Sequence, residues 1–258
     1  MCGRYVSVQS RASLLEYFNA MPVGPELSES YNVAPTNTVY GVLEHPPKDD
    51  EGSGNVGRQG RDLRWGLVPS WAKDIKIGSR LINARVETLS EKPSWRSAFR
   101  RRRLIIPARG YYEWTPREHD GKVTKQPFYI HPAGDEPLAF AGLYELWRDH
   151  AKADDDPDRW LWSAVIITTA ATGPAGEIHD RTPVILPPDR VDAWLDPQRT
   201  EPGQVYEVLD DIVMEQLDVR PVSTEVNRVG RDGPQLIKSL HTDAMDQPLQ
   251  LILTGRVL

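Results

Sequence analysis

RLIIPA (103–108) and GYYEWT (110–115) are two strand-like runs separated by a single arginine, and they decide the fold of this chain. PFYIHP (127–132), LAFAGLYELW (138–147) and the very apolar WLWSAVIITTA (160–170) follow, with turn-forming residues between them. Short β-branched and aromatic runs with turn chemistry between them predict strands joined by hairpins. We therefore expect an antiparallel sheet that curls into a barrel-like core.

The residues before this stretch add strands and one helix. RYVSV (4–8), TVYGVLE (38–44) and DLRWGLV (62–68) read as strands. QSRASLLEYFNA (9–20) reads as a helix with Ser10 as its N-cap.

The remaining elements are one strand and short helices. TPVILP (182–187) reads as a buried strand, and three segments read as helices: SEKPSWRSAFR (90–100), RVDAWL (190–195) and GQVYEVLDDIVMEQL (203–217). With no repeat and no evident linker, we expect one α+β domain over residues 1–258. Two polar insertions, 45–61 and 148–159, are expected to be loops of that domain.

The amino-acid composition excludes several classes of function. Apolar residues make up 39% and charged residues 26% of the 258 residues, as in a globular protein. No apolar run is long enough to cross a membrane, and the first residues lack a signal-peptide core. One cysteine excludes an internal disulfide framework and fits a reducing cytoplasm. With a net charge of -6, nucleic-acid binding needs a local basic patch, and RRRR (100–103) is the densest basic run.

The one cysteine lies in MCGRY, at the second position of the chain. Removal of Met1 would leave Cys2 with a free α-amine two carbons from its thiol. Such an aminothiol condenses with an aldehyde to an imine, which the thiol closes to a thiazolidine; alternatively the thiolate acts as an ordinary nucleophile. A third interpretation is that a small residue was selected only for terminal processing.

LINARVETLS (81–90) carries three alternating polar residues. On an extended segment, Asn83, Arg85 and Glu87 face one side and line a cleft. The alternative is an exposed strand with a surface salt bridge.

Two further stretches carry groups that transfer protons. Glu113 lies between Tyr112 and Trp114, where a carboxyl group is either at the surface or in an apolar pocket that suits acid–base work. His179 precedes Asp180 and Arg181 ahead of a buried strand and can shuttle protons, although such a loop is more often solvated. No histidine has metal-ligand spacing, so we expect neither a metal nor a cofactor.

Two proline-containing loops complete the candidates. PSWAK (69–73) carries Pro69 and Trp71, and YNVAPTN (31–37) carries Pro35. A tryptophan in such a loop either packs inward or offers a face on which a nucleobase can stack.

In chain order, MCGRY, YNVAP, WGLVPSWA, LINARVET, RRRLIIPARGYYEW, IHDRTPVIL and RPVSTEVN resemble the SOS-response-associated peptidase family, whose members are also described as abasic-site-processing proteins. The motifs run from residue 2 to about residue 228. The resemblance implies a DNA-damage protein that loses Met1 by autocatalysis, a peptidase activity, and binds single-stranded DNA. It also implies a covalent thiazolidine between the terminal cysteine and the aldehyde of an abasic site, which shields the lesion.

The resemblance also implies roles for individual residues. Cys2 would form the crosslink, Asn83 would hold the sugar or orient the amine, Glu113 would shuttle protons and assist loss of Met1, and His179 would promote opening of the sugar ring. The residues implied to contact DNA are Arg4, Arg85 and Arg181 at the phosphates and Pro35, Pro69 and Trp71 as a wedge and stacking surface.

Two other classes of function stay open at this point. One is a thiol peptidase that cleaves other proteins, with Cys2 as nucleophile and His179 as base. The other is a module that binds single-stranded or modified DNA without covalent chemistry. We expect a cytoplasmic bacterial monomer, nucleoid-associated when it acts, with the replication machinery as a further candidate partner.

Overall fold

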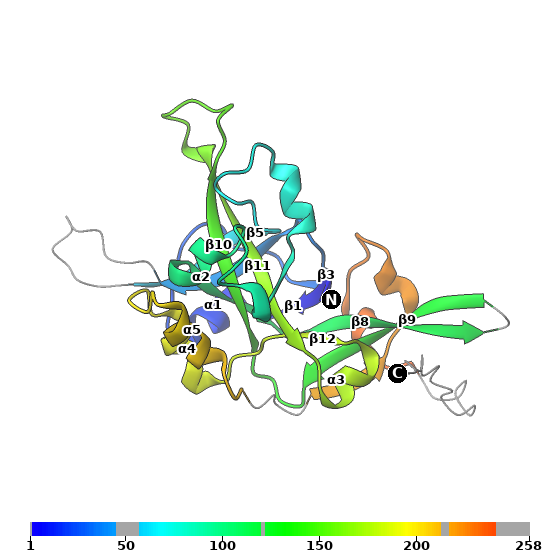
Figure 1. Ribbon diagram of the computed structural model, residues 1–258. Helices are drawn as coiled ribbons and strands as arrows, with labels where there is room; N and C mark the ends of the chain where they lie inside the picture. The colour runs from blue at the N-terminus through cyan, green and yellow to red at the C-terminus, as the bar shows by residue number, and fades with distance from the viewer. Residues whose placement is uncertain (1, 45–56, 120–121, 213–216, 241–258) are drawn as a thin grey trace.

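The computed structural model describes residues 2–44, 57–119, 122–212 and 217–240, and consists of two β-sheets with short helices around them (Figure 1). None of the helices in these ranges is long and apolar enough to span a bilayer.

The larger sheet closes into a barrel. Its strands pair around a ring, each with the next, in the order β11 (Trp160–Ala170), β10 (Leu138–Arg148), β7 (Arg103–Ala108), β4 (Thr38–Glu44) and β5 (Arg58–Trp65). The first four contacts are antiparallel, as expected, but β5 returns to β11 in parallel through two residue pairs, Ser163 with Arg64 and Ala164 with Trp65. The α+β, barrel-like expectation is therefore confirmed, with one short parallel seam that the sequence did not indicate.

The smaller sheet contains the amino terminus. Its order is β13 (Leu217–Pro221), β9 (Lys122–Pro132), β8 (Gly110–His119), β1 (Arg4–Ser7) and β3 (Ser30–Val33). Short strands extend the larger sheet: β2 (Met21–Pro22) on β5, and β6 (Asn83–Arg85) and β12 (Arg181–Pro183) on β11. The first strand of the chain thus lies inside a sheet, paired on both edges.

Aromatic side chains join the two sheets. Tyr5 and Tyr111 from the smaller sheet share one buried cluster with Trp65 and Phe140 of the barrel. The rings of Tyr5 and Trp65 meet edge-on with centroids 5.4 Å apart, and those of Tyr111 and Phe140 do so at 5.9 Å. Such pairs combine large apolar burial with a preferred geometry, so they set how the sheets meet.

Helices cover the outside of the barrel. A second buried cluster joins outward-facing strand residues to α1 (Arg11–Tyr17), α2 (Arg96–Arg101), α4 (Val191–Leu195) and α5 (Pro202–Leu209). α3 (Gly173–Ile178) lies instead beside β8 and β12, as Figure 1 shows. The 3-10 turns are η1 (Ile75–Arg80), η2 (Val86–Thr88), η3 (Pro157–Arg159), η4 (Pro188–Arg190), η5 (Thr224–Asn227) and η6 (Pro234–Ile237).

Most expected elements are present, with altered ends. Ser10 caps α1 as predicted, because its hydroxyl accepts a hydrogen bond from the Ser13 amide. The expected helix over 203–217 was too long: α5 ends at Leu209, and residue 217 begins β13, a strand that we did not predict. The insertion 148–159 is a connection between β10 and β11 as expected. The other insertion is shorter than 45–61 because β5 begins at Arg58; residues 45–56 lie outside the described residues.

The basic run 100–103 divides into two kinds of arginine. Arg103 is buried, and its guanidinium donates to the carbonyls of Phe99, Arg100, Trp194 and Asp196. Burial lowers the pKa of Arg103 to about 10. Arg103 thus completes the ends of α2 and α4, whose last carbonyls lack partners within the helix, whereas Arg100 and Arg101 are exposed.

We therefore predict that R103A destabilises the fold far more than R101A. The R103A variant leaves four carbonyls without their donor, two of them in fully buried hydrogen bonds, which we expect to lower the free energy of unfolding by about 3 kcal/mol. R101A should change it by less than about 0.5 kcal/mol. Urea denaturation followed by circular dichroism measures both; equal midpoints for the two variants would contradict this role.

Candidate functional site

Cys2 is buried at the junction of the two sheets. Its side chain has no exposed surface and belongs to the cluster that contains Tyr5 and Tyr111. The thiol donates a long hydrogen bond, 3.9 Å, to the Arg4 carbonyl. Burial, reinforced by the nearby Glu113, raises the pKa of the Cys2 thiol well above its ordinary value. At neutral pH this group is a thiol and not a thiolate.

Asn83 fixes the backbone of Cys2. It begins β6, which pairs in parallel with β11, and its Nδ2 donates a 2.7 Å hydrogen bond to the Cys2 carbonyl. Its Oδ1 is buried and has no hydrogen-bond partner among the residues that the structure describes. The amide thus holds the terminus with one atom and leaves an acceptor beside it.

Glu113 lies on β8, the strand that pairs with β1. The register sets Arg4 opposite Tyr112, and one more step along it brings Glu113 opposite Gly3. The side chain is 2% exposed. Burial raises the pKa of Glu113 to about 7, against the opposing influence of the positive amino terminus. Near neutral pH this carboxyl group can therefore both give and take a proton.

His179 follows α3, which contacts the strand that carries Glu113. Thr115 of β8 donates to the Ile178 carbonyl at 3.0 Å, which ties α3 to the strand that carries Glu113. The Nδ1 atom of His179 lies 3.0 Å from the Arg181 amide and 2.8 Å from the Asp180 carboxylate. Burial lowers the pKa of His179, so we assign a neutral imidazole that accepts the Arg181 N–H at Nδ1.

One electrostatic feature connects these groups. With Met1 in place, the positive charge of its amine lowers the pKa values of Cys2, Glu113 and His179. Among the described residues, Asn83 of β6 bonds the Cys2 carbonyl and Glu113 of β8 raises the pKa of the Cys2 thiol, so these three residues lie together. His179 follows α3, which contacts β8.

Sequence reasoning missed two neighbours of this group. The Tyr111 hydroxyl and the Thr182 hydroxyl are 2.8 Å apart, in a buried bond that joins β8 to β12. Burial raises the pKa of Tyr111, and Cys2 and Glu113 contribute to the increase. The period of two along GYYEW, which sets Tyr111 and Glu113 on one face of β8, is the signal that could have found the tyrosine.

The three predicted DNA-contacting arginines lie in different environments. Arg85 is exposed at the end of β6. Arg4 is half-buried and donates to Asn32 Oδ1 at 2.7 Å and to the Val226 carbonyl at 2.9 Å. Arg181 is only 8% exposed. Contact with phosphates stays a prediction for all three, and only Arg85 has its side chain exposed to solvent.

The prediction that Asn83, Arg85 and Glu87 share one face of an extended strand is wrong for Glu87. β6 ends at Arg85, and Glu87 lies in the 3-10 turn η2. Its carboxylate pairs with both terminal nitrogens of Arg181, at 2.6 and 3.0 Å. The alternative interpretation, a surface salt bridge between Arg85 and Glu87 on an exposed strand, therefore does not hold either. The chain leaves the extended conformation there, so alternation no longer applies.

The predicted wedge residues also differ in exposure. Trp71 is 57% exposed, Pro35 is half-buried, and Pro69 is buried with its carbonyl accepting from Ala72 at 2.9 Å. The loop with Pro35 is tied to the barrel, because the Thr36 amide donates to the Trp65 carbonyl at 2.8 Å. Trp71 is therefore the member of the three that presents a large apolar face.

Comparison with known proteins supplies the context of this site. Residues 1–229 match the model of a family described as SOS response associated peptidase. The abasic site processing protein YoqW of Bacillus subtilis is 40% identical over 93% of this chain and 100% of its own length. The abasic site processing protein HMCES of Xenopus tropicalis is 30% identical over 82% of this chain and 66% of its own.

Solved structures share the fold. A protein from Bacteroides thetaiotaomicron superposes with a TM-score of 0.75 and 21% sequence identity, over 93% of this chain and 100% of that one. At this identity the likeness concerns the fold alone.

The buried carboxyl group predicts a pH dependence of stability. With a pKa of about 7 in the folded chain against 4.5 ordinarily, Glu113 holds its proton more tightly in the folded state. Its stabilising contribution is thus present below pH 4.5 and is lost as pH rises through about 7. The loss should approach about 3 kcal/mol.

The E113Q variant cannot ionise and should lack this loss, whereas E118Q, at an exposed position of the same strand, should retain it. Unfolding free energies measured by urea denaturation across this pH range test the difference. Parallel profiles for wild type and E113Q would show that Glu113 is not the buried acid.

Proposed function

The chain belongs to the SOS response associated peptidase family, and from this premise we propose that it captures abasic sites in single-stranded DNA through its terminal aminothiol. The observation that carries the proposal is that Asn83 and Glu113 lie beside the buried Cys2. Relatives named for abasic site processing support the choice of substrate.

The first step of the proposed reaction is the removal of Met1, which frees the α-amine of Cys2. Met1 lies outside the described residues. Glu113 is suited to assist this hydrolysis, because a carboxyl group with a pKa of about 7 can activate a water and then return the proton to the leaving amine. This would be the peptidase activity of the chain, directed at its own end.

In the second step the amine, and not the thiol, attacks the lesion. The buried thiol is protonated at neutral pH and is a poor nucleophile, whereas an α-amine has a pKa of about 8. The amine adds to the aldehyde carbon of the opened abasic sugar, and loss of one water leaves an imine. The thiol sulfur then bonds to the imine carbon while its proton passes to nitrogen, which closes the thiazolidine.

The surrounding groups have separate tasks in this scheme. Asn83 holds the Cys2 carbonyl, and its free Oδ1 is the acceptor available to orient the amine. Glu113 receives the proton that the amine loses and returns it to the departing hydroxyl. Neutral His179, with Nδ1 engaged by the Arg181 amide, offers Nε2–H to the sugar oxygen as the ring opens.

DNA binding would use residues on either side of this group. The exposed Trp71 offers a stacking face, with Pro69 and Pro35 supporting the two loops, and the exposed Arg85 can meet a phosphate. Arg181 forms an ion pair with Glu87 and donates to the Thr168 carbonyl. Through the ion pair it fixes the position of η2, which follows Arg85 directly, and in this way it would contribute to DNA binding.

The test is a denaturing gel after incubation with a single-stranded oligonucleotide that carries one abasic site. Wild-type protein should give a slow-migrating protein–DNA band, because a thiazolidine survives denaturation. C2S should give no such stable band, since an imine without ring closure hydrolyses. An oligonucleotide with an intact base at the same position is the matched control, and a band there would contradict the abasic-site chemistry.

A second prediction separates the amine from the thiol. Protein that retains Met1 keeps the thiol but lacks the free Cys2 amine, so its crosslink yield should fall at least about a hundredfold. Intact-mass spectrometry establishes the state of the terminus before DNA is added. Normal crosslinking by Met1-bearing protein would overturn the aminothiol mechanism.

The same preparations decide between the other two classes. Cleavage of an unrelated peptide without a crosslink would favour a thiol peptidase, a reading that the protonated, buried thiol disfavours. DNA binding that is unchanged in C2S, without any crosslink in the wild type, would favour a non-covalent binding module.

A further inference from the structure

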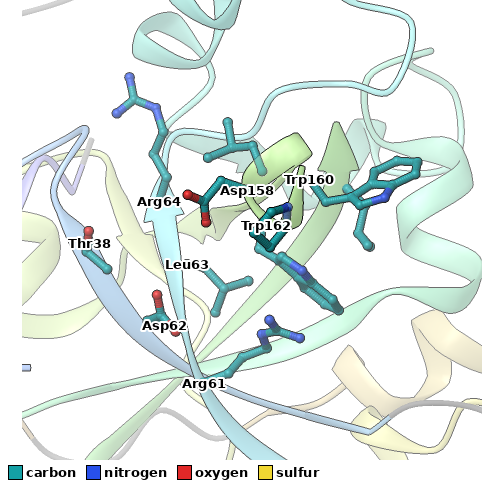
Figure 2. Close-up of a pocket in the computed structure, with 11 residues that line it drawn as sticks. Thr38, Arg61, Asp62, Leu63, Arg64, Asp158, Trp160 and Trp162 are labelled. Carbon is teal, nitrogen blue, oxygen red and sulfur yellow. The ribbon is translucent and has the colours of Figure 1, made fainter. Parts of the chain in front are cut away.

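A cavity of about 530 Å³ opens in the wall of the barrel, and none of the four predicted catalytic residues lines it. It lies where the parallel seam between β5 and β11 stops: the two strands pair at Ser163 with Arg64 and at Ala164 with Trp65, and the preceding residues diverge. Figure 2 shows Arg61 and Leu63 on one side of this gap and Trp160 and Trp162 on the other. The volume falls in the range of small-ligand sites, about 300–1,000 Å³.

The floor of the cavity is a stack of three planar groups. The Trp162 ring stacks with Tyr144, with centroids 5.5 Å apart and planes 19° apart, and the Arg61 guanidinium carbon lies 3.3 Å from the Trp162 ring centroid. The stack holds Arg61 rigidly with its plane against Trp162. The Arg61 Nε is buried and has no hydrogen-bond partner in the part of the chain that the structure describes, so a ligand in the cavity would not contact this atom.

The rim supplies a second cation and an open aromatic face. Arg64 lines the cavity, and its Nη1 donates to the Thr36 carbonyl at 2.9 Å. Trp160 is 43% exposed. Two carboxylates, Asp62 and Asp158, share the lining. The site therefore offers stacking surfaces, donors for one anion and acceptors for amino groups.

This combination fits one nucleotide better than other small ligands. A nucleobase has a π-face for Trp160 and polar edges for Asp158, and a single phosphate can meet the Arg64 guanidinium at the rim. Two carboxylates beside two arginines leave no net positive charge, which disfavours a polyphosphate.

The cavity also adjoins both loops that we propose to contact DNA. Arg64 and the Thr36 carbonyl connect it to the loop of Pro35. Leu161, from its lining, packs with Val68 and Ala72, which flank the loop of Trp71. A strand that passes between these loops can reach the gap between β5 and β11.

We propose that this cavity is a second nucleotide subsite, which holds an undamaged nucleotide of the bound strand by stacking on Trp160 and by contact with Arg64. This inference rests on the proposed function in its choice of ligand. It does not require the covalent chemistry at Cys2.

The test uses C2S protein, so that no crosslink forms, and a fluorescently labelled undamaged oligothymidylate. Fluorescence anisotropy should show that W160A weakens binding at least about fivefold, the effect of losing one stacked base. W160F keeps a stacking face and should bind nearly as wild type. Y17A is the matched control, because Tyr17 is an aromatic of similar exposure, 42%, on α1, and it should leave the dissociation constant unchanged.

Fluorine NMR of 5-fluorotryptophan protein identifies the ligand. The Trp160 signal, assigned by its loss in W160F, should shift with the oligothymidylate and much more weakly with free thymidine monophosphate. A shift of equal size with free thymidine monophosphate would show that the cavity binds a free mononucleotide and not a nucleotide of the strand, which would contradict the proposal. An unmoved Trp160 signal together with unaltered binding by W160A would overturn the proposal. If W160A weakens binding and the Trp160 signal shifts, but the wild-type protein forms no crosslink with an abasic site, the proposed function is contradicted and the subsite is not.

Discussion

Burial of the amino terminus between two sheets is the constraint on which the rest of the structure depends. A terminal segment is usually frayed, but here Cys2 is fully buried and β1 pairs with β3 on one edge and β8 on the other. The hydrogen bond from Asn83 to the Cys2 carbonyl adds a link to the barrel. The end of the chain is thereby held as firmly as a core residue, which is what a reactive amine requires if it is to meet a substrate in one geometry.

The same burial sets the protonation of the site. Removal from water disfavours every charged form, so the pKa of the Cys2 thiol and of Glu113 rises and that of His179 falls. Near neutral pH the thiol is therefore protonated, the imidazole is neutral and the Glu113 carboxyl group is about half protonated. Of the three, Glu113 exchanges a proton at small free-energy cost, because its pKa lies near the ambient pH.

Arginine is used here in several physically different ways. Arg103 completes helix ends with four carbonyl acceptors, Arg181 forms an ion pair with Glu87, and Arg61 stacks on Trp162. Its planar guanidinium carries several donors and can stack, which allows each arrangement. A count of basic residues therefore says little about DNA contacts, and RRRR contributes Arg100 and Arg101 to the surface but not Arg103.

The sequence by itself determined most strands of the barrel, the cap of α1 and the family. These features depend on local patterns: apolar runs between turns, a serine before a helix, and contiguous motifs. Tertiary structure alone decided the parallel seam between β5 and β11, the pairing of Glu87 with Arg181 and the bond between Tyr111 and Thr182. It also decided that the Cys2 thiol is buried. Each of these joins residues far apart in the chain, and local periodicity carries no information about which distant elements meet or how much water they exclude.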